Sequence, residues 1–103
     1  MRLPRRGMTW EEAILCAYDA VGGCSNNERI YTGVGKFKPL TKAHLRVTSH
    51  GGRTAFVHQV RKHITNLVRK GDLVRLTEAD NCCLTDAGRL RAASAMTRSA
   101  LAH

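Results

Sequence analysis

The sequence predicts an α+β fold that is mainly α-helical, with a three-helix core, a two-stranded β hairpin and a C-terminal helix. Two observations support this prediction. Apolar residues recur at helical spacing in several stretches, which open with a capping residue and close with glycine. The short apolar runs 73–77 and 82–85 flank a polar turn, 78–81, which is the pattern of a hairpin. A chain of 103 residues is large enough for one domain with a modest core.

The first helix is predicted to begin at Thr9, after a basic N-terminal arm, 1–8, that either reaches a polyanion or stays disordered. Thr9 and Glu12 have the spacing of a capping box, and Gly22-Gly23 ends the helix. Its predicted buried stripe consists of Trp10, Ala13, Ile14, Ala17 and Val21. Three of the eight acidic residues lie in this helix, so we expect it to face away from any polyanion.

A short second helix is predicted over 26–32, because Ser25 and Glu28 repeat the capping pattern. The long connection 33–53 that follows contains five basic residues and no acidic ones, namely Lys36, Lys38, Lys42, Arg46 and Arg53. A one- or two-turn helix over 42–48 is expected inside it. Long basic loops are often functional, and the alternative is a loop that contacts nothing.

The stretch 54–70 is predicted to be the helix around which the domain is built. Its apolar stripe consists of Val57, Val60, Ile64, Leu67 and Val68. Thr54 is the expected cap, Lys70 suits the last turn, and Gly71 ends the helix. The other side is basic and rich in hydrogen-bonding groups, which suits a DNA major groove; the alternative is a solvated surface helix.

A last helix is predicted to begin at 85–89 and to carry a loose apolar stripe, formed by Leu90, Ala93, Met96 and Leu101. We assign 9–92 to the domain and 93–103 to a C-terminal helical tail. The alanine content of this tail suits packing against a second copy of the chain, as a homodimer; fraying is the alternative.

The net charge of +9 and the pI of about 10.1 indicate a polyanion binder, and the alternative is a generally basic protein. No stretch approaches the roughly 20 apolar residues of a membrane span, and the start lacks the apolar run of a signal peptide. We therefore expect a cytoplasmic, nucleoid-associated protein with four reduced cysteines. No metal or cofactor site is expected. A zinc site that uses Cys24, Cys82 or Cys83 with a histidine is the alternative.

Three segments of the sequence resemble a known protein family. VRKHITNLVRKGDLVRL (60–76) followed by CCLTDAGRLR (82–91) resembles the recognition helix, glycine turn, wing and exit of winged helix-turn-helix DNA-binding domains. TWEEAILCAYDAVGG (9–23) resembles the first helix of HARE-type and Mrr N-terminal-like winged helices. The resemblance implies that the central helix enters the major groove and that the wing lies over the backbone or minor groove. Glu78 and Asp80 in the wing would repel phosphate, so the basic connection 33–53 is the alternative contact.

The resemblance also implies a set of site residues. Carried over by position, the base-contacting groups are Arg53, Thr54, His58, Gln59, Arg61, Lys62 and Thr65. The groups that fit phosphates are Arg69, Lys70, Arg75, Lys36, Lys38 and Lys42. Arg61 or Lys62 could bind guanine, and Gln59 could bind adenine. His63 lies closer to the apolar stripe and is expected to pack.

The sequence thus predicts sequence-preferring binding to double-stranded DNA, as a transcriptional regulator or DNA-targeting module. The alternative is a winged-helix interaction module that binds an acidic protein partner. We do not expect an enzyme, because the sequence lacks clustered carboxylates with a lysine, a Ser/His/Asp set and a glycine-rich phosphate loop.

Overall fold

The computed structural model describes residues 8–38, 54–76 and 81–101. The elements in this part of the chain are α1 (Trp10–Ala20), β1 (Cys24–Asn26), α2 (Asn27–Val34), α3 (Ala55–Lys70), β2 (Leu73–Arg75), β3 (Asn81–Leu84) and α4 (Asp86–Leu101). The strands form an antiparallel sheet of order β1-β3-β2. The prediction of a mainly helical α+β class is therefore confirmed. The predicted helix 42–48, residues 1–7 and the hairpin tip 77–80 lie outside the described residues.

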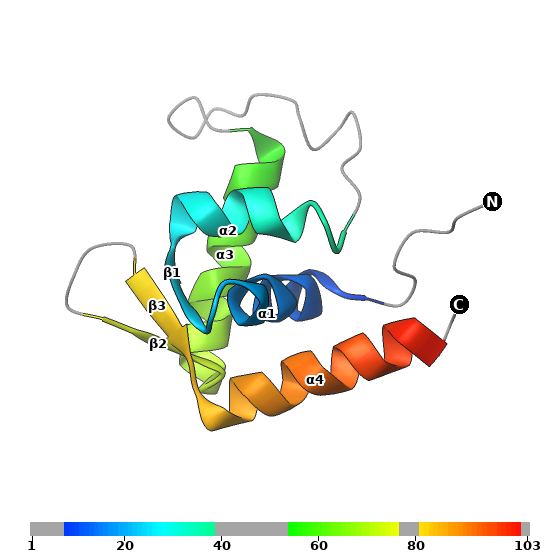
Figure 1. Ribbon diagram of the computed structural model, residues 1–103. Helices are drawn as coiled ribbons and strands as arrows, with labels where there is room; N and C mark the ends of the chain where they lie inside the picture. Colours follow the sequence, from blue (N-terminus) through cyan, green and yellow to red (C-terminus); the bar gives the residue numbers. More distant parts are fainter. Residues whose placement is uncertain (1–7, 39–53, 77–80, 102–103) are drawn as a thin grey trace.

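Helix α1 lies at the centre and contacts α2, α3 and α4, while the sheet closes one end of the molecule (Figure 1). The predicted capping box is present, because Thr9 and Glu12 exchange side-chain to backbone hydrogen bonds. Every residue from Ala13 to Tyr18 is buried, so α1 has more than one buried face. Trp10 and Val21, which were predicted in its buried stripe, are only half-buried. Met8, at the end of the predicted arm, belongs to the core with 5% of its surface exposed.

The sheet has three strands rather than the predicted two, because residues 24–26 form β1 along the far side of β3. Ser25, the predicted cap of α2, is instead buried and pairs with Cys82 in the register of the sheet. Asn26 caps α2 by accepting a hydrogen bond from the backbone N–H of Arg29 at 2.9 Å. The sequence of β1, Cys-Ser-Asn, is too short to show the apolar and polar alternation that predicts a strand. Its pairing with β3, far away in the sequence, decides its structure.

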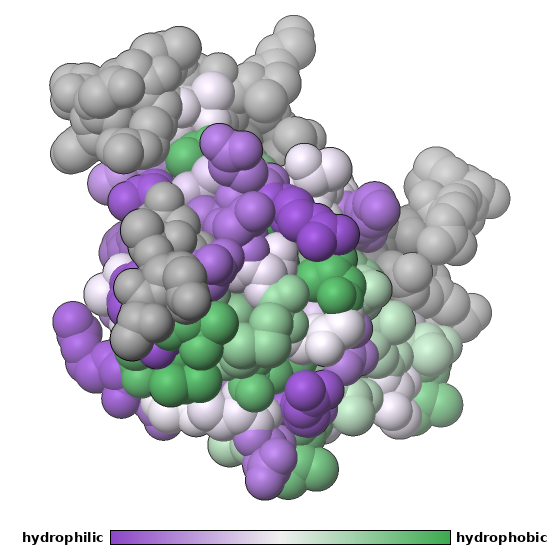
Figure 2. Space-filling model, turned by 60° about the vertical axis from the view of Figure 1, so that its left-hand side comes forward, coloured by the Kyte–Doolittle hydropathy of each residue, from purple (hydrophilic) through white to green (hydrophobic). Residues whose placement is uncertain are grey.

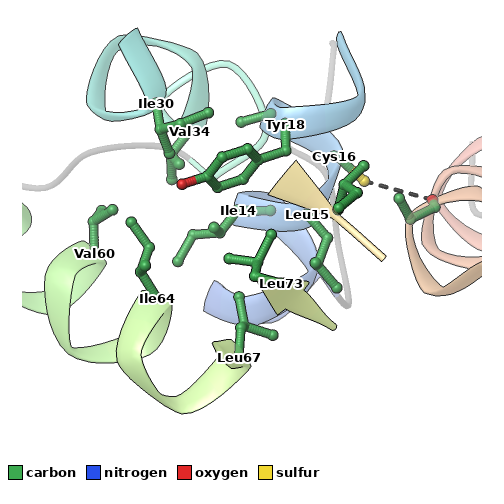
Figure 3. Close-up of a cluster of buried hydrophobic side chains, with 14 of the residues drawn as sticks. Ile14, Leu15, Cys16, Tyr18, Ile30, Val34, Val60, Ile64, Leu67 and Leu73 are labelled. Atoms are coloured by element: carbon green, nitrogen blue, oxygen red, sulfur yellow. Dashed lines mark hydrogen bonds between the residues drawn. The ribbon is translucent and has the colours of Figure 1, made fainter. Parts of the chain in front are cut away.

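Helix α3 has the predicted caps and three of the five residues of its predicted buried stripe; Val57 and Val68 are only partly buried, and Phe56, which was not predicted, is buried. Thr54 accepts a hydrogen bond from Val57 N at 3.2 Å, and Gly71 ends the helix with a φ of 91°. Val60, Ile64 and Leu67 are buried, and Figure 3 shows them in a cluster with side chains of α1, α2 and β2. Burying each of these side chains contributes about 2 kcal/mol, which anchors the inner side of α3.

Helix α4 packs through small residues rather than through the predicted apolar stripe. Leu90 and Leu101 are 72% and 82% exposed, Ala93 is exposed, and only Met96 is partly buried. The buried residues of α4 are Gly88, Ala92, Ala95 and Ser99. Small side chains let the backbone of α4 approach α1 so closely that the Cys16 thiol donates a hydrogen bond to the Ala92 carbonyl oxygen (3.6 Å; Figure 3). The segment 93–101 is therefore part of the packed domain.

Two of the four cysteines form a disulfide. Cys24 on β1 is bonded to Cys83, its direct register partner on β3. This corrects the prediction of four reduced thiols; Cys16 and Cys82 are buried and take no part in a disulfide. Cys82 and Cys83 point to opposite faces of the sheet, as neighbouring strand residues do. No helix in the described ranges is both long and apolar enough to cross a membrane.

Candidate nucleic-acid interface

A polar and basic stripe runs along the side of α3 that faces away from the core. Lys62, Thr65 and Arg69 are exposed, and His58 is half-exposed. At 3.6 residues per turn, these four side chains lie opposite Val60 and Leu67. Gln59 and Arg61 lie on the two flanks of the stripe. We call His58, Lys62, Thr65 and Arg69 the outer stripe; it brings together four of the side chains that the sequence assigned to DNA.

One flank of α3 is joined to α2 and β2 through hydroxyl groups. Arg61 Nη1 donates to the Tyr31 hydroxyl at 3.3 Å, and Thr65 Oγ1 donates to the Arg61 carbonyl oxygen at 3.2 Å. Arg75 Nη2 in turn donates to Thr65 Oγ1 at 3.3 Å. These bonds place two cationic side chains from different elements beside the outer stripe. A neutral hydroxyl orients a guanidinium but does not neutralise it.

The opposite flank of α3 is tied to carboxylates. Lys70 Nζ, predicted to contact phosphate, lies 2.8 Å from a Glu11 carboxylate oxygen. Arg91 of α4 bonds both Glu11 and the buried Asp72. Burial raises the pKa of Glu11, but its hydrogen bonds with Lys70 and Arg91 outweigh burial and hold that pKa below its usual value. Lys70 therefore links α3 to α1, and its charge is largely compensated within the molecule.

The second acid of the first turn of α1 is also paired. Glu12 binds Arg98 of α4 at 2.6 Å. With Glu11, it places the carboxylates of this turn on the side of α1 that meets α4 and the end of α3. Lys70 lies about 180° around α3 from Arg61, since nine residues at 100° each amount to two and a half turns. These acids therefore lie on the far flank of α3 from Arg61.

Aromatic side chains gather where the start of α3 meets the start of α1. The Trp10 ring lies 5.7 Å from Phe56 and stacks on His63 at 6.1 Å, measured between ring centroids. Lys38 Nζ sits 5.3 Å from the Trp10 ring centroid, and Lys36 is exposed just beyond α2. His63 is thus a packing residue, as predicted, and burial lowers its pKa.

The outer face of the sheet carries apolar and uncharged side chains. The register aligns Val74, Cys83 and the disulfide partner Cys24 across the three strands. Val74 and Leu76 are 48% and 42% exposed. In Figure 2, which brings the sheet side of the molecule forward, hydrophobic surface gathers in the lower half of the view and hydrophilic surface above it. The described part of the hairpin therefore offers little positive charge on this face, and Arg75 points the other way, toward α3.

Two further side chains belong to this region although the sequence did not single them out. Arg29 is exposed on the first turn of α2. Tyr31 lies on α2, and its hydroxyl is the acceptor for Arg61. A tyrosine beside a basic helix has no sequence signal for such a bond, because the two residues are 30 positions apart. Arg53 and Lys42, two of the predicted contacts, lie outside the described residues.

A hollow of about 380 Å³ lies at the start of α1, lined by Thr9, Trp10, Glu11, Glu12, His63 and Arg91. Its charged side chains pair within the molecule, so it presents little net charge to a ligand. Within the described residues, no three His, Cys, Asp or Glu side chains come together as a metal site. The outer stripe of α3 is therefore the stronger candidate for a functional surface.

Comparison of the chain with protein family models, with curated proteins and with solved structures finds no match.

Proposed function

We propose that this chain is a winged helix-turn-helix protein that binds double-stranded DNA with α3 in the major groove, as a transcriptional regulator or DNA-targeting module. The observation that carries the proposal is the outer stripe, which runs along a helix whose inner side is fixed in the core. With 16 residues, α3 is about 24 Å long, and a B-DNA major groove about 12 Å wide admits an α-helix.

The order of the elements supports this proposal. Helices α2 and α3 follow one another, and α3 leads through Gly71 into the β2–β3 hairpin. The segments 60–76 and 82–91, which resemble winged-helix proteins, form most of α3, β2, β3 and the start of α4. In the family, the corresponding elements are the recognition helix, the wing and the exit from the wing. In such proteins the second helix of the pair enters the groove while the first crosses the backbone. Arg29 on α2 is then a candidate phosphate contact.

The distribution of charge also supports the proposal. Glu11, Glu12 and Asp72 bond Lys70, Arg91 and Arg98 on one flank of α3 and along α4. The cations near the outer stripe are Arg61, Lys62, Arg69 and Arg75. A row of cations that lies apart from Glu11, Glu12 and Asp72 attracts phosphates and orients the helix on a duplex.

Salt dependence tests the proposal directly. If the phosphate contacts are Arg29, Lys62, Arg69 and Arg75, these four cations release enough counterions to give a log–log slope of affinity against salt of about −4. Fluorescence anisotropy with a labelled duplex measures this slope. Two lysines of α3 form a matched pair: Lys62 lies in the outer stripe, and Lys70 is bonded to Glu11.

We expect Lys62→Ala to make the slope shallower by about 0.9 and to weaken binding to every duplex. Lys70→Ala should leave the slope unchanged, because the ammonium already has a carboxylate partner. A wild-type slope near zero, or equal effects of the two variants, would contradict groove binding through the outer stripe.

The second candidate function is an interaction module for an acidic protein. The exposed Leu90 and Leu101 of α4 favour it, because at eleven residues apart they lie on one side of the helix and offer a protein partner apolar contacts that a duplex does not need. Competition separates the two functions. If the outer stripe is shaped for DNA, polyglutamate should displace a labelled duplex poorly. If the outer stripe recognises negative charge alone, as an acidic protein partner requires, polyglutamate should displace the duplex as well as unlabelled duplex does.

A further inference from the structure

We propose that Tyr31 is a positioning residue for Arg61, so that α2 sets the base preference of α3 through a side chain that touches no base. The inference rests on the proposed DNA binding and adds to it a determinant of specificity. It starts from the 3.3 Å hydrogen bond that Arg61 Nη1 donates to the Tyr31 hydroxyl.

Tyr31 is a rigid support for this bond. Its ring is half-buried and packs against the core, and its neighbour Ile30 on α2 is fully buried, as is Val34 one turn on. A tyrosine has two side-chain torsions, so a packed ring leaves its hydroxyl little freedom to move. Arginine, in contrast, carries about 2 kcal/mol of rotamer entropy. A bond to a fixed hydroxyl therefore restricts Arg61 before DNA arrives, which lowers the entropic cost of a specific contact.

The geometry suits a base contact as well as a restraint. Arg61 lies on the flank of α3 next to the outer stripe, where α2 and α3 meet. A guanidinium has five N–H donors in one plane, so a bond to Tyr31 through Nη1 fixes the orientation of the whole fork. Guanine offers O6 and N7 as a matching pair of acceptors in the major groove. Thr65 donates its hydroxyl to the Arg61 carbonyl oxygen, and Arg75 donates to the same hydroxyl, so both brace this turn of α3.

The test begins with selection of a preferred duplex by the wild-type protein from a library with a randomised core. Affinities are then measured for the selected duplex and for a scrambled duplex of the same composition. Tyr31→Phe removes the hydroxyl and keeps the ring. We expect the ratio of the two affinities to fall about fivefold, which is the size of one hydrogen bond. The scrambled affinity and the salt slope should stay unchanged, because no charge is lost.

Two variants control this measurement. Tyr18→Phe changes the chain's other tyrosine, whose hydroxyl is buried in the core, and it should not change the ratio. In an Arg61→Ala background, Tyr31→Phe should have no further effect, because the residue that it positions is gone. An unchanged ratio in Tyr31→Phe, equal losses on both duplexes, or an additive loss in the Arg61→Ala background would each overturn the inference.

A DNA-free measurement separates this inference from the proposed function. In the free protein, the NMR order parameter of the Arg61 Nε–H group should fall in Tyr31→Phe, and no change there would overturn the restraint. If the wild-type protein binds no duplex, the DNA function is wrong and the inference falls with it. If the wild type prefers one duplex and Tyr31→Phe keeps that preference, only the inference is wrong.

Discussion

Gly88 gives a direct test of how α4 meets the end of α3. A Cβ at this position would lie 2.1 Å from the carbonyl oxygen of Asp72 and 3.1 Å from a methyl carbon of Leu84. Thr85, at the start of α4, donates its hydroxyl to Gly71 O at 2.6 Å and its backbone N–H to Asp72 O at 3.1 Å. Gly88→Ala must therefore push the first turn of α4 away from the residues that connect α3 to β2.

Gly88→Ala should destabilise the protein, although helix propensity alone would make alanine stabilising at this position. Alanine is favoured over glycine inside a helix by about 1 kcal/mol. Overpacking against a neighbour costs about 1–3 kcal/mol, and the atom met here belongs to the backbone, which yields less than a side chain. Weakening one or two hydrogen bonds of Thr85 adds about 1 kcal/mol each. The net result is a loss of about 2–3 kcal/mol in the free energy of unfolding, which lowers the Tm by about 10 °C.

Urea denaturation followed by Trp10 fluorescence measures this loss. Gly35→Ala is the matched control, because Gly35 has an ordinary φ of −60° and a Cβ there would lie 3.7 Å from the nearest atom, Thr32 O. We expect that control to be neutral or slightly stabilising. If Gly88→Ala is as stable as the wild type, α4 does not approach the backbone of Asp72 as closely as 2.1 Å from this Cβ position requires.

Two further predictions concern the sheet and the aromatic cluster. The Cys24–Cys83 disulfide links residues 59 positions apart, and chain entropy gives such a link up to about 4 kcal/mol. Dithiothreitol should therefore lower the free energy of unfolding of the wild type but not of a Cys24→Ser/Cys83→Ser variant; equal effects on both would refute this. Burial lowers the pKa of His63, so the unfolded chain binds its proton more readily than the folded one. Stability from this group is present above about pH 6.5 and is lost as the pH falls through the lowered pKa. Denaturation at about pH 7.5 and about pH 5 should show a loss in the wild type that shrinks in His63→Gln; an identical loss would show that other groups cause it.

Local hydrogen bonds explain which parts of the fold the sequence could predict. Thr9 and Thr54 cap their helices through contacts within three residues, and Gly71 closes α3 through its own left-handed backbone. These contacts need no knowledge of the rest of the chain. Strand β1 and the disulfide depend instead on register between segments 59 positions apart, and neither has a local pattern.

The buried face of α4 could not be predicted from the sequence for a different reason. A buried helix face is usually predicted from large apolar residues at helical spacing. In α4 that pattern indicated Leu90 and Leu101, which are exposed. The contact with α1 uses Ala92, Ala95 and Ser99, whose small size permits close approach. A pattern based on hydrophobicity gives low weight to such residues, so it assigned the wrong face of this helix.

For the candidate site, the sequence predicts which side of α3 is polar but not how its cations differ. Lys62 and Lys70 have the same side chain on the same helix, and periodicity places both away from the apolar stripe. Glu11, 59 positions earlier, compensates Lys70, whereas Arg61 on the other flank is held by the neutral hydroxyl of Tyr31. A carboxylate partner reduces what a cation can offer a phosphate, whereas a hydroxyl partner is neutral and restricts the direction of the cation. Lys70 should therefore contribute less to DNA binding than Lys62, which carries the same side chain in the outer stripe.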